Sequence, residues 1–567
     1  MAYKKDKKIV CLLGLCLLSL CFLVICLLIM GKDDVIFNNV EEINFSRESG
    51  FYNDEFDLNI SSIGGTVFYT LDGSVPTCNS MKYDGPIHIS DATENENVYS
   101  NKVDISQIYI VNALNDFVMG DLSNITPQYK VDKCTVVRAV VYYGGGIYSK
   151  VKTASYFVGF NNKSGYENMN VVSIVTDPTN LFDYENGIYV TGKEFDDNIL
   201  THKEDYLASN PMDLDSNYHL RGIDSERTAS CQFFDTDYDL ILSQDCGIRI
   251  HGGTTRASIQ KSFNLFSRKE YNGSKFFNKS FFGKDYATQK MTLSQGGNDD
   301  RCKINDYLVN CLATELNYST MKFSPYVLFL DGEYWGVYWL TEKYDKEYLR
   351  YHYRVDPDNI IIVKNGLLEE GRESDFEDFE EMMAYCSTSD MSNQANYMET
   401  CKFIDIDSYI DYYATMILIS RCGDWPVTNE EMWKTSKKGS GNYEDGKWRW
   451  MLFDVNWGAM DVENAEFDSI EYTMNESPMF ANLMQNDDFK NRLLDKIIEL
   501  SNTVFSCERV KKEISNFRVL MDEPMKNNNL RFYGEDAYDD YLDHIADVDK
   551  FFLKRNTFIS ELVEKYR

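Results

Sequence analysis

Three side chains in the second half of the chain have the types and order found in phosphoryl-transfer sites. Asp424 opens a loop, Asn429 follows five residues later, and Asp454 lies thirty residues after Asp424. In such sites one aspartate accepts the proton of the acceptor hydroxyl, and an asparagine and a second aspartate hold magnesium against the phosphates. Amide and carboxylate groups supply the oxygen ligands that Mg²⁺ prefers. A chain this rich in acids contains many such triples, so the spacing alone does not identify the chemistry.

The elements around these residues indicate how they would be positioned. Asp424 follows DIDSYIDYYATMILISRCG, whose apolar spacing predicts a long amphipathic helix that stops at Gly423. Asp454 ends KWRWMLFD, in which two tryptophans and a leucine alternate as in a half-buried strand. A carboxylate at the end of such a strand costs free energy unless it is paired. A magnesium ion is one candidate partner for Asp454, beside an apolar wall that would exclude water.

The sequence from about residue 171 onward predicts a mixed α+β domain. GIRIHGGTTRASIQKSFNLF predicts strands on either side of a glycine turn. LFLDGEYWGVYWLTEKYDKEYL predicts a hairpin that turns at Asp331-Gly332 and is followed by a helix. NDYLVNCLATELN predicts another helix, and residues 478–567 read as mostly helical and charged.

The N-terminus predicts a membrane anchor. Ile9–Met30 is a run of 22 residues without charge, and about 20 residues span a bilayer. Four lysines precede the run, so the positive-inside rule places the N-terminus in the cytoplasm and the bulk of the chain outside the cell. Residues 1–33 would thus form a cytoplasmic tip and a single-pass anchor in the cell membrane. A cleaved signal peptide is the alternative, although no small-residue cleavage site precedes Gly31.

Charge and cysteine content limit the classes of partner. The 567 residues carry a formal net charge of −33, which argues against a nucleic-acid partner. Four of the fourteen cysteines lie in the apolar run, and the other ten permit disulfides. None has the CxxC spacing of a zinc site. Cys302 and Cys311 are expected to share one helix, too far apart to bridge.

Residues 43–158 predict a small β-sandwich, because short alternating runs are separated by glycine turns. The words YTLDGSVPT and YDGPIHI resemble the β-sandwich at the C-terminus of chitobiases and β-hexosaminidases. In those enzymes the module is accessory. The resemblance implies a spacer or a surface-binding unit here, with an envelope polysaccharide as its ligand.

The second part of the chain resembles the CotH family. GIRIHGGTTRASIQKSFNLFSRKEY, LSQGGNDD, LFLDGEYWGVYWLTEKYDKEYL, RCGDWPVTN and KWRWMLFDVNWG stand in the order and rough spacing of that family. Its members are spore-coat and extracellular proteins with an atypical protein-kinase fold. The resemblance covers about residues 170–500 and leaves 501–567 as a helical C-terminal extension. It implies phosphorylation of serine or threonine in secreted or surface proteins, with ATP and Mg²⁺ or Mn²⁺ as cofactors.

The resemblance also implies a role for each candidate residue. Asp424 matches the catalytic acid, Asp454 the metal-binding acid, and Asn429 the amide that follows the catalytic acid. The candidates for cofactor binding are Lys261, Arg249 and Glu342, with Arg256 and Lys364 as further ones. Asn456 stands where many members carry a second acid, which leaves a second metal open.

Each candidate also has a structural interpretation. Asp454 could cap a turn, Lys261 could be a surface strand lysine, and Glu342 could be an acid at a helix start. The glycines at 252 and 253 could form a hairpin turn in place of a phosphate cradle, and His251 is more often structural than a ligand. Two further functions stay open: a non-catalytic surface-binding module with a kinase-like fold, and a glycosidase using Asp424 and Asp454 as acid and base.

Overall fold

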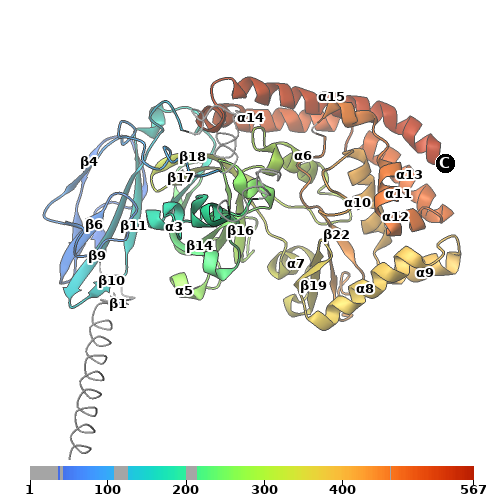
Figure 1. The fold of residues 1–567 in the computed structure, drawn as a ribbon, viewed down its shortest axis with the longest axis horizontal. Coiled ribbons are helices and arrows are strands. Elements are labelled where there is room, and N and C mark those ends of the chain that lie inside the picture. The colour runs from blue at the N-terminus through green and yellow to red at the C-terminus, as the bar shows by residue number, and fades with distance from the viewer. Residues whose placement is uncertain (1–35, 39–42, 107–125, 199–213, 460) are drawn as a thin grey trace, which may run out of the picture. The chain divides into compact units, whose positions relative to one another are not determined.

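The computed structural model describes residues 36–567 apart from 39–42, 107–125, 199–213 and 460 (Figure 1). The predicted anchor Ile9–Met30 lies outside the described residues. Among the helices that are described, none is long and apolar enough to cross a membrane. The chain divides into two compact units, one of residues 1–48, 56–89 and 137–154, and one of residues 49–55, 90–136 and 155–567.

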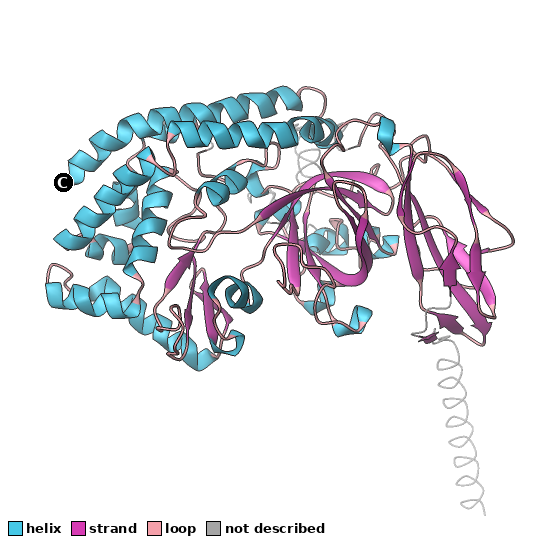
Figure 2. Cartoon of the chain, turned by 180° about the vertical axis from the view of Figure 1, so that it is seen from behind, coloured by secondary structure: helices cyan, strands magenta, loops and turns pink. Residues whose placement is uncertain are grey.

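The first unit is built of short strands (Figure 2). Strand β9 (Thr135–Gly144) pairs antiparallel with β6 (Thr66–Thr70) and with β10 (Ile147–Ser149). Gly65 precedes β6 at a φ of +64°, and a Cβ there would lie 2.3 Å from Val141, so the turn requires glycine. The remaining strands of this unit are β1 (Ile36–Asn38), β2 (Ile43–Phe45), β4 (Phe56–Leu58), β5 (Ile60–Ser62), β7 (Met81–Lys82) and β8 (Ile87–Ile89).

A closed seven-stranded sheet forms the first part of the second unit (Figure 2). Its strand order is β12-β13-β14-β15-β16-β18-β17, and the parallel pairing of β12 with β17 closes it. The strands are β12 (Asn170–Val175), β13 (Arg227–Phe234), β14 (Leu240–His251), β15 (Ser262–Phe266), β16 (Lys290–Ser294), β17 (Phe323–Leu330) and β18 (Glu333–Thr341). Asp331 and Gly332, both at positive φ, join β17 to β18 and confirm the predicted hairpin.

A four-stranded antiparallel sheet with the order β20-β19-β21-β22 follows in the same unit. Its strands are β19 (Ile360–Lys364), β20 (Leu367–Glu370), β21 (Glu431–Thr435) and β22 (Arg449–Met451). All three residues of β22 are buried, and not alternately exposed as predicted, because Arg449 on the second face pairs with Asp405 and Asp445 and Met451 packs in a hydrophobic cluster.

The helices of this unit confirm the predicted α+β character and the helical C-terminal region. Short ones are α3 (Pro178–Phe182), α5 (Lys269–Asn272), α6 (Asn305–Leu312) and α7 (Lys346–Tyr353). The others are α8 (Glu373–Thr388), α9 (Gln394–Phe403), α10 (Ile406–Leu418), α11 (Ser469–Glu476), α12 (Pro478–Leu483), α13 (Asp487–Asn502), α14 (Cys507–Phe532) and α15 (Ala537–Tyr566). Helix α10 ends before the expected Gly423, because Ser420 already adopts a left-handed φ of 69°.

The last helix is fastened to the core by one buried arginine. Helices α14 and α15 lie side by side (Figure 1), and Arg555 of α15 is fully buried. Its guanidinium donates to the carbonyls of Ile417 at 2.6 Å, Ala465 at 3.0 Å and Phe467 at 2.7 Å. These carbonyls belong to the end of α10 and to the segment after β22, so α15 holds together the two chain segments that flank the candidate site.

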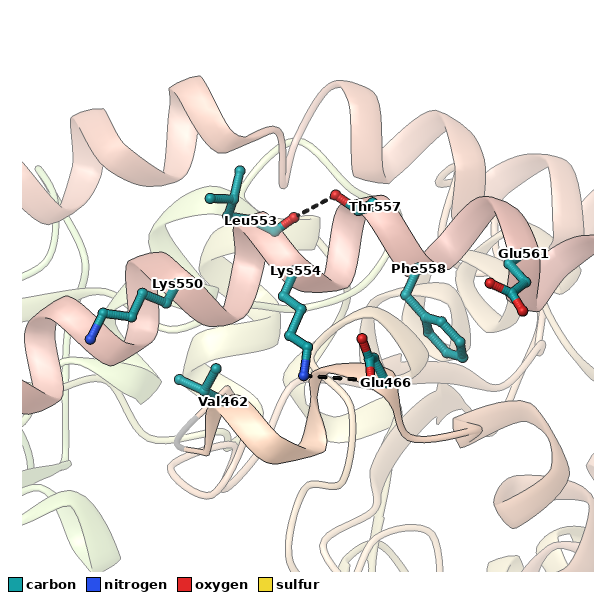
Figure 3. Close-up of a pocket in the computed structure, with 8 residues that line it drawn as sticks. All are labelled: Val462, Glu466, Lys550, Leu553, Lys554, Thr557, Phe558 and Glu561. Carbon is teal, nitrogen blue, oxygen red and sulfur yellow. Dashed lines mark hydrogen bonds and ion pairs between the residues drawn. The ribbon is translucent and has the colours of Figure 1, made fainter.

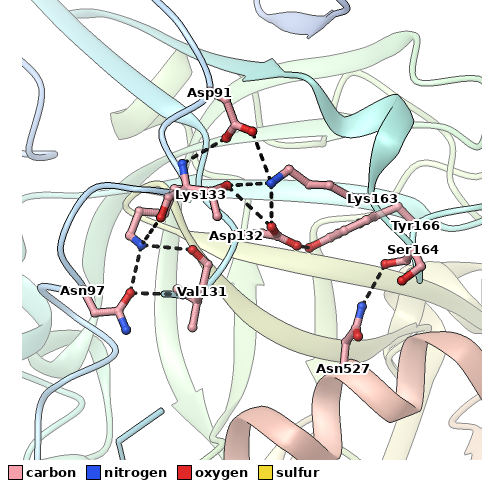
Figure 4. A network of polar contacts seen from close by, with 10 residues as sticks. Asp91, Asn97, Val131, Asp132, Lys133, Lys163, Ser164, Tyr166 and Asn527 are labelled. Carbon is pink, nitrogen blue, oxygen red and sulfur yellow. Dashed lines mark hydrogen bonds and ion pairs between the residues drawn. The ribbon is translucent and has the colours of Figure 1, made fainter. Parts of the chain in front are cut away.

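A second polar network ties the segment 90–136 to the rest of its unit (Figure 4). Lys163 Nζ lies 2.7 Å from Asp132 and 3.4 Å from Asp91, and the Tyr166 hydroxyl donates to Asp132 at 2.7 Å. Asn527 of α14 donates to the Ser164 carbonyl at 2.9 Å. Because these groups pair with one another, this cluster has a structural role.

Candidate functional site

The loops that carry Asp424 and Asp454 leave the same end of the small sheet. Glu431 of β21 pairs with Met451 of β22, so the residues before Glu431 and after Met451 emerge together. The loops also touch directly, since Ala459 N–H donates to the Ile419 carbonyl at 3.0 Å. The nearby charge of Asp424 contributes to a raised pKa of Asp454, although burial is the larger cause. The structure therefore brings the two predicted acids together, with Asn429 in the loop between Asp424 and β21.

Asp454 shares its half-buried position with a second carboxylate, Asp306, in the first turn of α6. Asp306 accepts a hydrogen bond from the backbone N–H of Val455 at 2.8 Å. Burial and the neighbouring Asp454 raise the pKa of Asp306 to about 7. Asp454 itself adopts a left-handed φ of 55° and accepts a hydrogen bond from the Asn456 side-chain amide. Two carboxylates held this close favour a divalent cation that would offset their repulsion.

The donor set fits magnesium. Asp306, Asp454 and Asn429 offer carboxylate and amide oxygens, the ligands of a hard cation. Asn456 instead donates to Asp454 and so orients that carboxylate, which gives the residue at the family's second acid position a role without charge. Asp306 was missed in the sequence because it lies 148 residues before Asp454 and has the position of an ordinary acid in the first turn of a helix.

A basic cavity of about 240 Å³ lies at the edge of the closed sheet. No acidic side chain is among the described residues that line it, in a chain whose net charge is −33. Burial and the cations around it lower the pKa of nearby His251 well below its usual range, so this imidazole is neutral. Such a cavity suits phosphate groups. Its lining comprises Arg221, Gly222, Ser225, Arg249, Ile250, Arg256, Asn264, Phe266, Lys290 and Lys343.

Two lysines connect the basic cavity to the carboxylates. Lys343 lines the cavity, and burial together with the charge of Lys364 lowers its pKa to about 8. Lys364 Nζ lies 3.3 Å from the centroid of the Phe453 ring and 3.6 Å from Glu431 Oε2. The charge of Lys364 also acts on the adjacent Asp454, whose pKa it pulls downward. The charge of Lys364 therefore acts both on Lys343 in the cavity lining and on Asp454 in the carboxylate pair.

The three predicted cofactor-binding residues lie in different places. Arg249 lines the basic cavity over the Phe266 ring, with its Nε 3.4 Å from buried Glu226. Lys261 does not line it. The ammonium group of Lys261 is buried and donates to the carbonyls of Arg256 at 2.6 Å and Ser258 at 2.8 Å. Lys261 is thus neither a surface lysine nor a cavity-lining one, and it holds the turn that carries Arg256 into the lining.

Glu342 is buried away from the cavity lining and has a histidine partner. His352 Nε2 lies 2.7 Å from Glu342 Oε1, and the Lys322 backbone N–H donates to Oε2 at 2.8 Å. Helix α7 begins only at Lys346 and is capped by Asp345, so Glu342 is not an acid at a helix start either. The structure thus gives Glu342 partners within the protein and does not place it in the lining of the basic cavity.

Another cavity, of about 470 Å³, lies between the 3-10 helix η9 (Val462–Glu466) and α15 (Figure 3). Lys554 Nζ lies 3.5 Å from Glu466 across it, and the Thr557 hydroxyl donates to the Leu553 carbonyl at 3.0 Å. Its lining mixes both signs of charge and contains none of the candidate residues. The lining of the smaller basic cavity is therefore the better suited of the two to a phosphate group.

A basic cavity and, in the same unit, a pair of half-buried carboxylates are compatible with a kinase-like class of site. Comparison with protein families agrees with that class. The family model described as CotH kinase protein matches residues 248–559, more than half of the chain, and the chain belongs to this family. The model described as Fn3 associated matches residues 57–156 and supports the predicted β-sandwich-like module. A search of curated proteins gives no match.

Proposed function

We propose that the protein is an atypical protein kinase that transfers the γ-phosphate of ATP to serine or threonine of secreted or surface proteins. The observation that carries the proposal is the Asp306–Asp454 pair in the same unit as a cavity lined by cations, with the charge of Lys364 acting on both Lys343 and Asp454. Membership of the CotH kinase family supports the same class.

Each group has a separate task in this proposal. Lys290, Lys343 and Arg249 bind and orient the phosphates. Asp454 and Asp306, with Asn429, would hold Mg²⁺ or Mn²⁺, which when bound supplies charge neutralisation at the transferring phosphate. Asp424 is exposed beside this site, where an incoming hydroxyl can reach it, and accepts the hydroxyl proton.

Location and partners follow from the N-terminal sequence. Ile9–Met30 anchors the protein, the remainder faces the outside, and the β-sandwich-like module binds envelope polysaccharide. The apolar run and its lysine flank support this arrangement. Protease added to intact cells should degrade the C-terminal part of a membrane-bound chain. Recovery of mature protein in the medium, starting beyond residue 30, would contradict the anchor.

The decisive experiment incubates the full chain with γ-labelled ATP, Mg²⁺ or Mn²⁺, and either a casein-like acceptor or the chain itself. Label should enter protein in a metal-dependent manner. The non-catalytic binding module is the second candidate, and it is favoured if the chain neither binds nucleotide nor transfers phosphate. The cations that line the cavity favour a phosphate ligand over the neutral sugar that a glycosidase would bind.

A further inference from the structure

Three residues outside the proposed active site bring metal-binding atoms together. Asp299 lies in the turn before α6, Cys302 follows it, and His544 comes from α15. Their carboxylate, thiol and imidazole atoms all lie within 4.8 Å of one another. Asp299 and Cys302 are buried, and the His544 side chain is about 20% exposed. The cluster therefore joins two segments more than 240 residues apart.

The polar atoms of this cluster are not satisfied by one another. His544 Nε2 is buried and has no hydrogen-bond partner among the described residues. It lies 3.6 Å from Asp299 Oδ1, which is too long for a hydrogen bond. Asp299 Oδ2 is already used, since it accepts from the backbone N–H groups of Ile304 at 2.7 Å and Asn305 at 2.8 Å. These two bonds fix the carboxylate and leave Oδ1 facing His544.

We propose that Asp299, Cys302 and His544 form a zinc site. Tetrahedral Zn²⁺ has ligand atoms about 2.0–2.3 Å away, which sets them roughly 3.3–3.8 Å from one another. The separation of 3.6 Å between His544 and Asp299 matches this spacing. The mixed oxygen, sulfur and nitrogen set suits zinc and not magnesium. Water takes the fourth position, and coordination converts the Cys302 thiol to a thiolate whose proton passes to solvent.

The position of the site indicates its effect. Helix α6 begins at Asn305, directly after the cluster, and carries Asp306 beside Asp454. Bound zinc would link α15 to the residues directly before α6, and this link would restrict the motion of Asp306 beside Asp454. Cys302 was expected in one helix with Cys311, but it lies before α6, because Lys303 adopts a left-handed φ of 65°. That break turns Cys302 toward α15, where Tyr541 O lies 4.0 Å from its sulfur.

The test uses the full chain, stripped with a chelator and titrated with Zn²⁺ and separately with Co²⁺. We expect one Zn²⁺ per chain by mass spectrometry of metals, a higher melting temperature, and a thiolate-to-cobalt charge-transfer band. Cys302→Ser should abolish the band, and His544→Gln should weaken Zn²⁺ binding by more than about 100-fold, since loss of even an outer-shell partner costs about 10–100-fold.

Two control variants separate this site from others. Cys311→Ser removes a partly buried thiol of α6 outside the cluster and should leave zinc binding unchanged. Asp454→Asn should also keep zinc, so failure of the kinase proposal would not affect this one. Absence of the cobalt band from the parental protein would overturn the proposal, whether or not the variants fold. Parental zinc affinity in both Cys302→Ser and His544→Gln would overturn it as well.

Discussion

Asp306 reaches from the first turn of α6 to the backbone N–H of Val455, which it binds at 2.8 Å. This contact sets one carboxylate beside another, because Val455 directly follows Asp454. A half-buried carboxylate pair is costly without a counter-ion, so it makes the metal proposal testable.

Asp454→Asn should abolish the stabilisation by Mg-ATP, because it removes a charge at nearly constant volume. A ligand that binds only the folded state raises the melting temperature, so thermal denaturation with and without Mg-ATP is the measurement. Asp306→Asn should show the same loss. Glu561→Gln, at an exposed acid of α15, serves as the control. An undiminished Mg-ATP shift in Asp454→Asn would remove that residue from the metal site.

Asp424→Asn should bind Mg-ATP normally and lose phosphotransfer by at least about 100-fold. A group that accepts a proton in the transition state contributes about 10²–10⁴-fold in rate. Initial rates with γ-labelled ATP and binding by calorimetry separate the two effects. If the variant transferred phosphate at the parental rate, Asp424 would have no part in the chemical step.

Lys290→Met should weaken binding of ATP and of inorganic tripolyphosphate alike. The Lys290 side chain lines the basic cavity, so it would contact the phosphate groups that both ligands carry. Raised salt should reduce the difference in affinity between the variant and the parent, because salt screens the charge of Lys290. Lys269→Met is the matched control, since Lys269 is exposed and does not line the cavity. Equal affinities in parent and Lys290→Met would place the phosphates elsewhere.

Tripolyphosphate affinity should fall as the pH rises through about 8. The pKa of Lys343 is about 8 in the folded protein, so its ammonium loses the proton there, and an anion binds the protonated form. One pH unit above this value the affinity should be about tenfold lower if binding requires the proton. Lys343→Arg should flatten the fall, because guanidinium keeps its charge. A pH-independent affinity in the parent would argue against contact with Lys343.

The lowered pKa of Lys343 also predicts that stability changes with pH, in the direction opposite to the change in tripolyphosphate affinity. Between about pH 8 and the ordinary lysine pKa of 10.5, the unfolded chain binds more protons at Lys343 than the folded one. Stability rises with pH wherever the unfolded state binds more protons. The contribution of Lys343 to the free energy of unfolding should therefore increase over this window. Lys343→Met should remove that increase in denaturant titrations.

Cys231 and Cys246 should form a disulfide when the protein is made in an oxidising compartment. Their sulfur atoms lie 2.6 Å apart across β13 and β14, and both residues are fully buried. The two thiol protons and two electrons pass to the oxidant during folding, before burial closes the site. Peptide mapping without reductant should find these two residues linked. Recovery of both as free thiols would contradict the prediction, and Cys311 serves as the unlinked reference.

The sequence predicted the elements of the site better than its complete set of residues. Local signals identified the hairpin at Asp331-Gly332 and the loops of Asp424 and Asp454, since turn chemistry and apolar periodicity act over a few residues. Asp306 and Lys343 depend on contacts across the fold, which no local pattern encodes. Their carboxylate and ammonium groups become notable only when burial changes their pKa values.

Lys261 shows the limit of transferring a role by position alone. The strand in this segment was predicted correctly and is β15, which begins directly after Lys261. The direction of its side chain was not, because two carbonyls of the preceding turn and the Tyr218 ring, 3.8 Å from its ammonium, hold it inside. A helix end also differed from the prediction, since Ser420 adopts a left-handed φ three residues before Gly423, which is left-handed as well.

The buried guanidinium of Arg555 also determines when, during synthesis, the segments around the candidate site can be joined. During synthesis the carbonyls of Ile417, Ala465 and Phe467 leave the ribosome about 90–140 residues before their partner. Until α15 emerges, the segments on either side of the Asp424 and Asp454 loops lack the group that joins them. The nascent chain therefore carries all of the proposed catalytic residues before it can hold them in place, and the proposed phosphotransfer would have to wait until α15 has docked.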